Sequence, residues 1–247
     1  SILDTNGNEL FLLTATGSAV NEFTLANAAT GNDPTLSATG GDSNIDIAIK
    51  PKGSGETVFG TGAAAATLTS SGANDLILDT NSGTNSGTFT ITDAANGAMT
   101  MAPNGYGKFT ITGQGKIQAV AEKVTVEATA ATGTKNFDAL TQAVWYYTTN
   151  ASGDWTINLR GDGSTTMNTI MATGESLTLC HLVTIGSSEY VNSTVQVDGT
   201  TSGVTTEWQG GSAPTEGNAN SIDSYVYTVI KTGDATYTVL ASLTQYA

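Results

Sequence analysis

The sequence predicts an all-β protein, with an N-terminal, repeat-containing β stalk followed by a C-terminal head that folds as a β-sandwich or jelly roll. The first observation is the composition: the 247 residues include 44 threonines and 29 glycines, but only 12% are charged. A helical bundle or coiled coil needs abundant Leu, Glu, Lys and Arg, so both classes are excluded. The second observation is that apolar and polar residues alternate over short segments, which is the period of a β-strand. The third is an internal repeat in the first half.

The repeat consists of three blocks that return in the same order. They are Ile-Leu-Asp-Thr-Asn at 2–6 and 77–81, Phe-Thr-x-x-x-Ala-Ala-x-Gly at 23–31 and 89–97, and Pro-x-Gly-x-Gly at 51–55 and 103–107. Repeats of one supersecondary unit indicate a stacked or fibrous architecture, although two copies are fewer than a solenoid needs. We therefore assign residues 1–62 to stalk repeat 1 and residues 63–115 to a linker followed by stalk repeat 2.

Short strands are expected within these blocks, at residues 45–49, 88–92 and 108–112. Threonine suits them because its branched Cβ favours extended backbone while its hydroxyl keeps one face wet. Strands with so few apolar side chains bury little apolar surface within one chain. Several intertwined chains would let each apolar stripe face its copies, which predicts an oligomeric stalk. The alternative is an irregular monomeric β domain.

Residues 116–136 are expected to form a neck between stalk and head. Ile117, Val120 and Val124 have helical spacing, whereas Val124, Val126 and Ala128 have strand spacing. We favour a strand-rich neck. Ahead of it, residues 60–74 are small and low in complexity, and they look like a joint between the repeats.

Residues 137–247 are expected to form a denser β head. All three tryptophans and seven of the eight tyrosines lie there. Turn signals such as Asp198-Gly199 separate the expected strands. Six or more short strands at this spacing favour a sandwich or jelly roll. The expected strands are residues 143–148, 155–160, 176–185, 192–198, 224–231 and 236–243.

The charge limits the partners. The chain carries 22 acidic and 8 basic residues, a net charge of −14. Such a surface repels phosphates and anionic lipid, so we expect no nucleic-acid partner.

No secretory signal is recognisable, and the apolar stretches are too short to span a bilayer, so we expect no membrane insertion.

Residues that could carry catalysis are few. Cys180 and His181 are the only cysteine and the only histidine, and neighbours in a strand point to opposite faces, so they cannot form a dyad. The Arg160-Gly161-Asp162 tripeptide of adhesion ligands is better explained by turn geometry. We expect no catalytic residue, no cofactor and no metal. A polysaccharide depolymerase, with paired carboxylates, is the enzymatic alternative.

A long polar loop is the candidate recognition element. Residues 208–218 are Gly-rich and begin with an aromatic residue. Sugars stack on such rings beside amide and carboxylate groups, and loops on a β scaffold carry such sites. The candidate contacts for a host cell-surface glycan are Trp208, Gln209, Glu216 and Asn218. The alternative is that Trp208 closes an edge of the sandwich.

Several segments together resemble structural and fibre-like proteins of marine tailed bacteriophages, cyanophages especially. They are residues 47–55, 81–97, 208–215, 227–232 and 238–247. The resemblance implies a homotrimeric, intertwined, non-enzymatic appendage on the virion, assembled in the host cytoplasm among other virion proteins. It implies a tail fibre, head fibre or decoration, and it carries over no catalytic residue. The alternative from the residues is a monomeric carbohydrate-binding module or adhesin.

Overall fold

The computed structural model gives a nearly all-β protein, as predicted. The residues that it describes are 1–58, 68–70, 72–80 and 84–246. Most of the joint expected at 60–74, and the end of the repeated block at 77–81, lie outside the described residues.

The contacts divide the chain into two compact units. One consists of Ser1–Leu76 with Ile91–Ala98, and the other of Ile77–Thr90 with Met99–Ala247. The sheets within them are described one at a time below. We use "N-terminal region" for residues 1–123 and "C-terminal sandwich" for residues 124–246.

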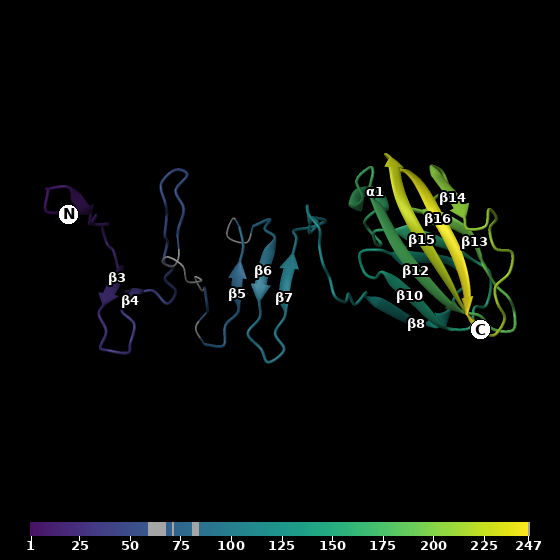
Figure 1. Cartoon of the computed structure of the whole chain (residues 1–247), viewed down its shortest axis with the longest axis horizontal. Helices are drawn as coiled ribbons and strands as arrows, with labels where there is room; N and C mark the ends of the chain where they lie inside the picture. The colour runs from purple at the N-terminus through teal and green to yellow at the C-terminus, as the bar shows by residue number, and fades with distance from the viewer. Residues whose placement is uncertain (59–67, 71, 81–83, 247) are drawn as a thin grey trace. The chain divides into compact units, whose positions relative to one another are not determined.

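The N-terminal region contains short strands in small sheets (Figure 1). β1 pairs antiparallel with β2, β3 pairs antiparallel with β4, and β5, β6 and β7 form a three-stranded sheet. The strands are β1 (Ile2–Leu3), β2 (Glu9–Phe11), β3 (Asn21–Ala26), β4 (Thr35–Gly40), β5 (Leu76–Leu78), β6 (Thr88–Ile91) and β7 (Met99–Ala102).

Of the three strands expected in this region, one is confirmed and two are wrong. β6 occupies the segment expected at 88–92. Residues 45–49 and 108–112 form no strand. A strand requires a hydrogen-bonded neighbour, and the described residues provide none for either segment, despite their alternating apolar residues.

The two Pro-x-Gly-x-Gly segments fold into the same turn. In each, the last glycine amide donates to the carbonyl of the residue after proline, at 3.1 Å from Gly55 to Lys52 and 3.0 Å from Gly107 to Asn104. The middle glycine has a positive φ in both, 63° in the first and 56° in the second. A side chain at that position would be strained, which accounts for glycine in both segments.

Burial differs sharply along the chain. Among the described residues, none before Ala131 is buried. The large apolar side chains of the N-terminal region are instead mostly exposed, and they come from all of its small sheets and the segments between them. They include Leu3, Phe11, Leu13, Phe23, Leu25, Ile49, Ile77, Met99, Phe109, Ile117 and Val120.

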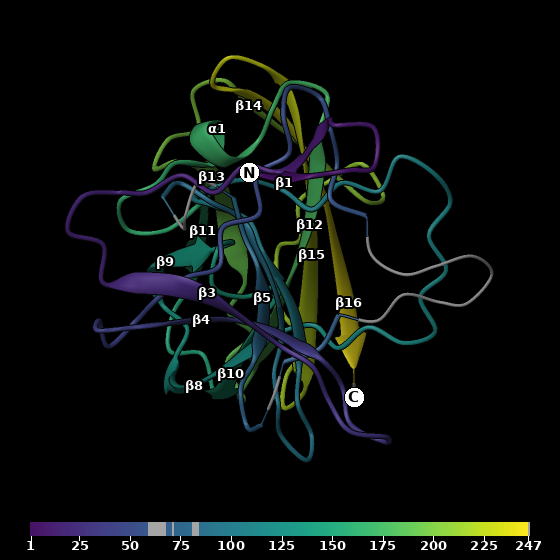
Figure 2. The ribbon, with the colours of Figure 1, turned by 90° about the vertical axis from the view of Figure 1, so that its left-hand side faces the viewer.

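The C-terminal sandwich is built from two sheets, one of six strands and one of three. The six-stranded sheet has the order β14-β16-β15-β12-β10-β8, and the three-stranded sheet has the order β13-β11-β9. Figure 2 shows β9, β11 and β13 on one side and β12, β15 and β16 on the other. The elements are β8 (Val124–Ala130), β9 (Gly133–Asp138), β10 (Val144–Thr149), β11 (Trp155–Arg160), α1 (Met167–Ile170), β12 (Ser176–Thr184), β13 (Asn192–Val197), β14 (Val204–Trp208), β15 (Ile222–Gly233) and β16 (Thr236–Tyr246).

The pairing departs from a jelly roll. From β8 to β13 the chain alternates between the two sheets, so that β8, β10 and β12 pair in parallel in one sheet and β9, β11 and β13 in the other. A jelly roll is made of antiparallel Greek keys. The strands β8 to β13 therefore form three stacked turns of a parallel β-coil, and each turn gives one strand to each sheet. Antiparallel strand pairs in the sandwich are confined to β12, β15 and β16.

The boundaries expected for the head need correction, while its strands are confirmed. The structure has strands at all six of the expected segments. However, β8 and β9 belong to the sandwich, so its sheets begin at Val124 rather than at residue 137, and the strand-rich neck is largely part of them. The Asp198-Gly199 turn is also confirmed, with positive φ at both residues as in a type I′ turn.

Aromatic side chains fill the space between the two sheets. Trp155 on β11 is 1% exposed. Its ring lies edge-on to Tyr225 at 5.4 Å and to His181 at 5.9 Å between centroids. Phe137 on β9 contacts Trp145 on β10 at 5.8 Å. Cross-sheet pairs of this kind stabilise a sandwich beyond the area that they bury.

Candidate functional site

Trp208, the proposed stacking residue, faces the interior of the sandwich. It ends β14 and pairs in register with the buried Ala241. Its ring lies edge-on to Tyr225 and Tyr227, with centroids 6.5 and 6.4 Å away. This half-buried ring closes the end of the sandwich, which is the alternative that the sequence left open.

Gln209 follows directly and is exposed. Its amide donates to the carbonyl of Ala241 at 2.8 Å, which leaves its side chain at the surface. Trp208 and Gln209 together border a shallow hollow of about 330 Å³. The other residues around it are Glu207, Val226, Thr228, Leu240, Ala241 and Ser242.

Glu216 and Asn218 do not line that hollow. Glu216 is exposed. Asn218 is tied down, because its amide donates to Oδ2 of Asp223 at 3.2 Å and its carbonyl accepts from Ser221 Oγ at 2.6 Å. The structure thus brings two of the four expected residues to one place, and glycan recognition by the four stays a prediction.

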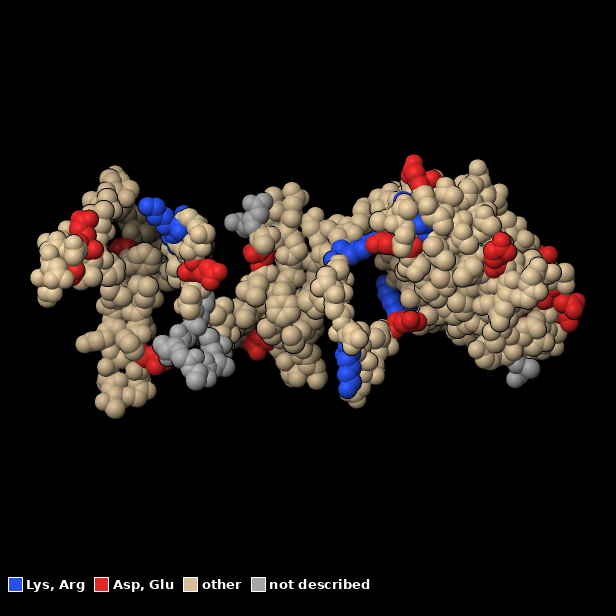
Figure 3. All heavy atoms as spheres, turned by 45° about the horizontal axis from the view of Figure 1, so that its top comes forward, with Lys and Arg blue, Asp and Glu red and all other residues tan. Residues whose placement is uncertain are grey.

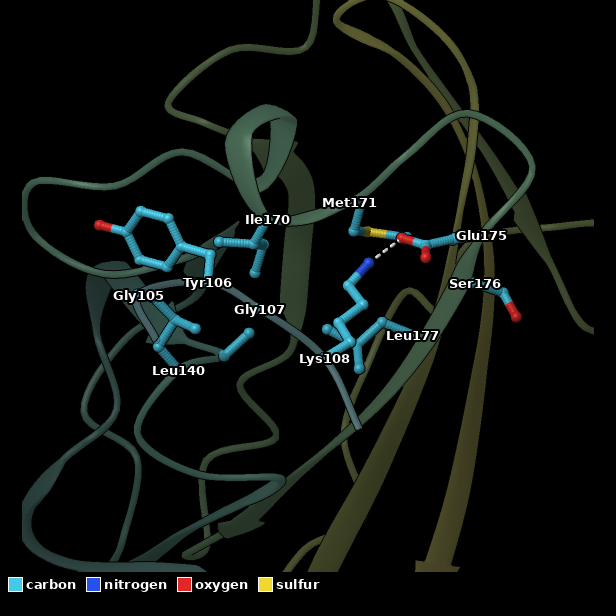
Figure 4. A pocket seen from close by; sticks show the side chains of 11 residues that line it. Gly105, Tyr106, Gly107, Lys108, Leu140, Ile170, Met171, Glu175, Ser176 and Leu177 are labelled. Atoms are coloured by element: carbon cyan, nitrogen blue, oxygen red, sulfur yellow. Dashed lines mark hydrogen bonds and ion pairs between the residues drawn. The ribbon is translucent and has the colours of Figure 1, made fainter. Parts of the chain in front are cut away.

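A larger groove lies where the Pro103 turn meets the sandwich (Figure 4). It has a volume of about 470 Å³. Tyr106 OH and Thr165 Oγ1 are 2.6 Å apart, and Lys108 pairs with Glu175 across the groove. The Lys108 ammonium holds the pKa of the Glu175 carboxyl below its ordinary value. The groove is lined by Gly105, Tyr106, Gly107, Lys108, Ala139, Leu140, Ile170, Met171, Glu175, Ser176 and Leu177.

The sequence reasoning missed this contact, although the repeat contains a signal for it. The first copy of the turn has Ser54 and Glu56 where the second has Tyr106 and Lys108. The two turns share one backbone, but only the second has an aromatic hydroxyl between its last two glycines and a cation directly after the last one. These two changes are the ones that hold the second turn against the sandwich.

Cys180 and His181 point to opposite faces of β12, as predicted. His181 is fully buried and neither ring nitrogen has a hydrogen-bond partner. Burial, with a smaller contribution from Lys135, lowers the pKa of His181 to about 3. Its imidazole is therefore neutral and enclosed by aromatic rings, where no substrate reaches it.

The Arg160-Gly161-Asp162 tripeptide is used internally. Arg160 Nε donates to Asp138 Oδ1 at 2.6 Å. The Asp162 carboxylate accepts from the amides of Ser164 and Thr165 at 2.8 and 2.7 Å, as an Asx turn does. Arg160 therefore joins the end of β11 to the end of β9, and Asp162 holds the β11–α1 connection.

The described residues contain neither a candidate metal site nor a helix that could cross a membrane. No group of three or more His, Cys, Asp or Glu side chains among them is placed to hold a metal ion. No helix in the described part of the chain is long and apolar enough to cross a membrane. Comparison of the chain with protein-family models, with curated protein sequences and with solved structures finds no match.

Proposed function

We propose that this chain is a non-enzymatic structural protein of a tailed-bacteriophage virion, in which three copies form a fibre or decoration on the particle. In this proposal the N-terminal region is an intertwined stalk, and each C-terminal sandwich is a head at its end. The protein works by assembling and presenting a surface.

One observation carries the proposal: the large apolar side chains of the N-terminal region are mostly left uncovered by the described residues of their own chain. Leu13 is 73% exposed and Leu25 is 77% exposed. Leaving a large aliphatic side chain in water forgoes roughly 1.5–3 kcal/mol relative to burying it. A soluble monomer rarely exposes so much apolar surface, so other protein chains are the expected cover.

The number of copies and the location come from other observations. The resemblance of residues 47–55 and 81–97 to marine-phage fibre proteins supports a homotrimer on the virion. The sandwich supports a structural role, because its histidine, His181, whose pKa burial lowers to about 3, is enclosed in the core.

The mass of the purified full chain tests the assembly. Mass photometry from nanomolar to micromolar concentration is expected to show a species of three times the 25.1 kDa chain mass. A monomer at every concentration would overturn the proposal and favour the monomeric carbohydrate-binding module or adhesin.

Immunogold labelling of phage particles with antibodies against the sandwich then tests the location, and unlabelled particles would exclude a virion protein.

A further inference from the structure

The six-stranded sheet has one face toward the three-stranded sheet and one outer face, which points away from the core. On β12, Leu179, His181 and Val183 are buried, whereas Cys180 and Leu182 between them point outward. The registers extend this face across the sheet. One row is Val124, Val144, Cys180, Val226 and Ser242, and the next is Val126, Tyr146, Leu182, Ser224 and Thr244.

This outer face is almost free of charge. On its six strands, all of which the structure describes, the outward side chains are aliphatic, aromatic, thiol or hydroxyl groups, and Glu207 on the edge strand β14 is the one that is charged. Figure 3 shows scattered acidic side chains on the sandwich, with wide uncharged areas between them. A solvated sheet face is ordinarily rich in charged residues.

The lack of charge indicates the kind of partner. A chain with 22 acidic and 8 basic residues repels its own copies wherever acidic faces meet. Copies can therefore approach closely through an uncharged face. The face has no lysine or arginine among its described residues, so phosphate-bearing partners find no cation there.

The exposed apolar residues of the preceding chain continue onto this outer face. Ile117 and Val120 are exposed, and they are followed along the chain by Val124 and Val126, which are also exposed, Val126 to 65%. The exposed apolar side chains that precede the sandwich are thus followed, without a break in the pattern, by exposed apolar side chains on β8. Copies that cover the first pair are positioned to cover the second.

The size of the face suits a specific interface. β12, β15 and β16 have 9, 12 and 11 residues. At about 3.3 Å per residue and about 4.8 Å between strands, a six-stranded face covers on the order of 700 Å². One side of a standard protein interface buries about 800 Å².

We propose that copies of this chain meet through the outer face of the six-stranded sheet, packed around a shared axis with β8 nearest to that axis. This inference rests on the proposed assembly and adds to it a defined surface on the sandwich. The assembly is held along the N-terminal region and also, by this second interface, between the sandwiches.

Cys180 offers a direct test, because the only thiol of the chain lies in the middle of this face and is half-buried in a single chain. We would measure its rate of maleimide labelling in the full chain, assembled at micromolar concentration and diluted to monomer. Protection of at least tenfold on assembly is expected. The double variant Val126→Glu/Val226→Glu should lose that protection. It places one acidic side chain in each of the two rows, where the copies would repel one another.

Controls separate this inference from the proposed function. Thr134→Cys in a Cys180→Ser background places a thiol at an exposed site on β9, in the other sheet, and it should label equally fast in both states. A chain that assembles while Cys180 stays equally reactive would overturn the interface and leave the assembly standing. A chain that never assembles would overturn both.

Discussion

The N-terminal region and the C-terminal sandwich contain similar alternating strands, but among the described residues only those of the sandwich form a buried core. Phe89-Thr90-Ile91 on β6 alternates as Trp155-Thr156-Ile157 on β11 does. In β11 the apolar side chains meet a second sheet and become buried, whereas Ile91 stays exposed. Alternation therefore specifies a strand with two different faces, and a second layer decides whether the apolar face is covered.

The largest expected effect is loss of a core aromatic in the sandwich. Trp155→Ala removes a ring that contacts both Tyr225 and His181. It should destabilise the sandwich by about 3–5 kcal/mol, the usual cost of Trp→Ala in a core. Urea unfolding followed by circular dichroism measures this. A loss below about 1 kcal/mol would mean that the two sheets do not share this core.

The matched change in the N-terminal region should act differently. Phe11→Ala removes a side chain that is 63% exposed in one chain. The unfolding midpoint of the sandwich should be unchanged, and the concentration needed for assembly should rise. If Phe11→Ala lowered the stability of the monomer as Trp155→Ala does, Phe11 would belong to a core within its own chain.

The next effect concerns pH and is confined to the sandwich. His181 has a folded pKa of about 3, against about 6.5 when unfolded. The unfolded chain binds the proton first, so stability falls as pH drops below about 6.5. At pH 5 the expected loss is about 2 kcal/mol relative to pH 7. Unfolding at both pH values, compared with His181→Phe, isolates this contribution, and an equal loss in both proteins would refute it.

A smaller effect is expected at the short helix. Asp198 accepts from the amides of Met167 and Asn168 at 2.6 and 3.1 Å, and its own φ is 52°. Asp198→Ala loses the cap and strains the turn, at about 1–2 kcal/mol. Asp198→Asn keeps an acceptor and tolerates the left-handed backbone, so it should cost clearly less. Equal thermal shifts for the two variants would argue against this explanation.

The smallest effect is expected where the Pro103 turn contacts the sandwich. The Lys108–Glu175 pair is largely solvated, and exposed pairs contribute below about 1 kcal/mol. Lys108→Ala should therefore shift the thermal midpoint little, and 0.5 M salt should produce most of the same shift in the wild type. A large, salt-independent shift would show that the turn contributes more than this ion pair.

Much of the sandwich was predictable from sequence, because its strands are long and bounded by turn residues. β14 was missed because three consecutive polar residues, Thr205, Thr206 and Glu207, interrupt the apolar alternation, and the strand leads directly into the Gly-rich loop. The same short strand turns Trp208 inward, which the loop composition does not reveal. The boundary at Val124 was also missed, since β8 becomes part of a sheet only by pairing with β10, a long-range contact. The strand expected at residues 45–49 was wrong for the opposite reason: the pattern is strand-like, but none of the described strands pairs with it.

Hydrogen–deuterium exchange of the full chain at two concentrations tests the central claim most directly. Assembly through copies predicts that backbone amides of β3 and β6 are protected at micromolar concentration and lose that protection on dilution to monomer. Amides of β12 and β15 should stay protected in both conditions. If the amides of β3 and β6 were equally protected in the diluted monomer, the N-terminal region would fold without its copies, which would contradict the account.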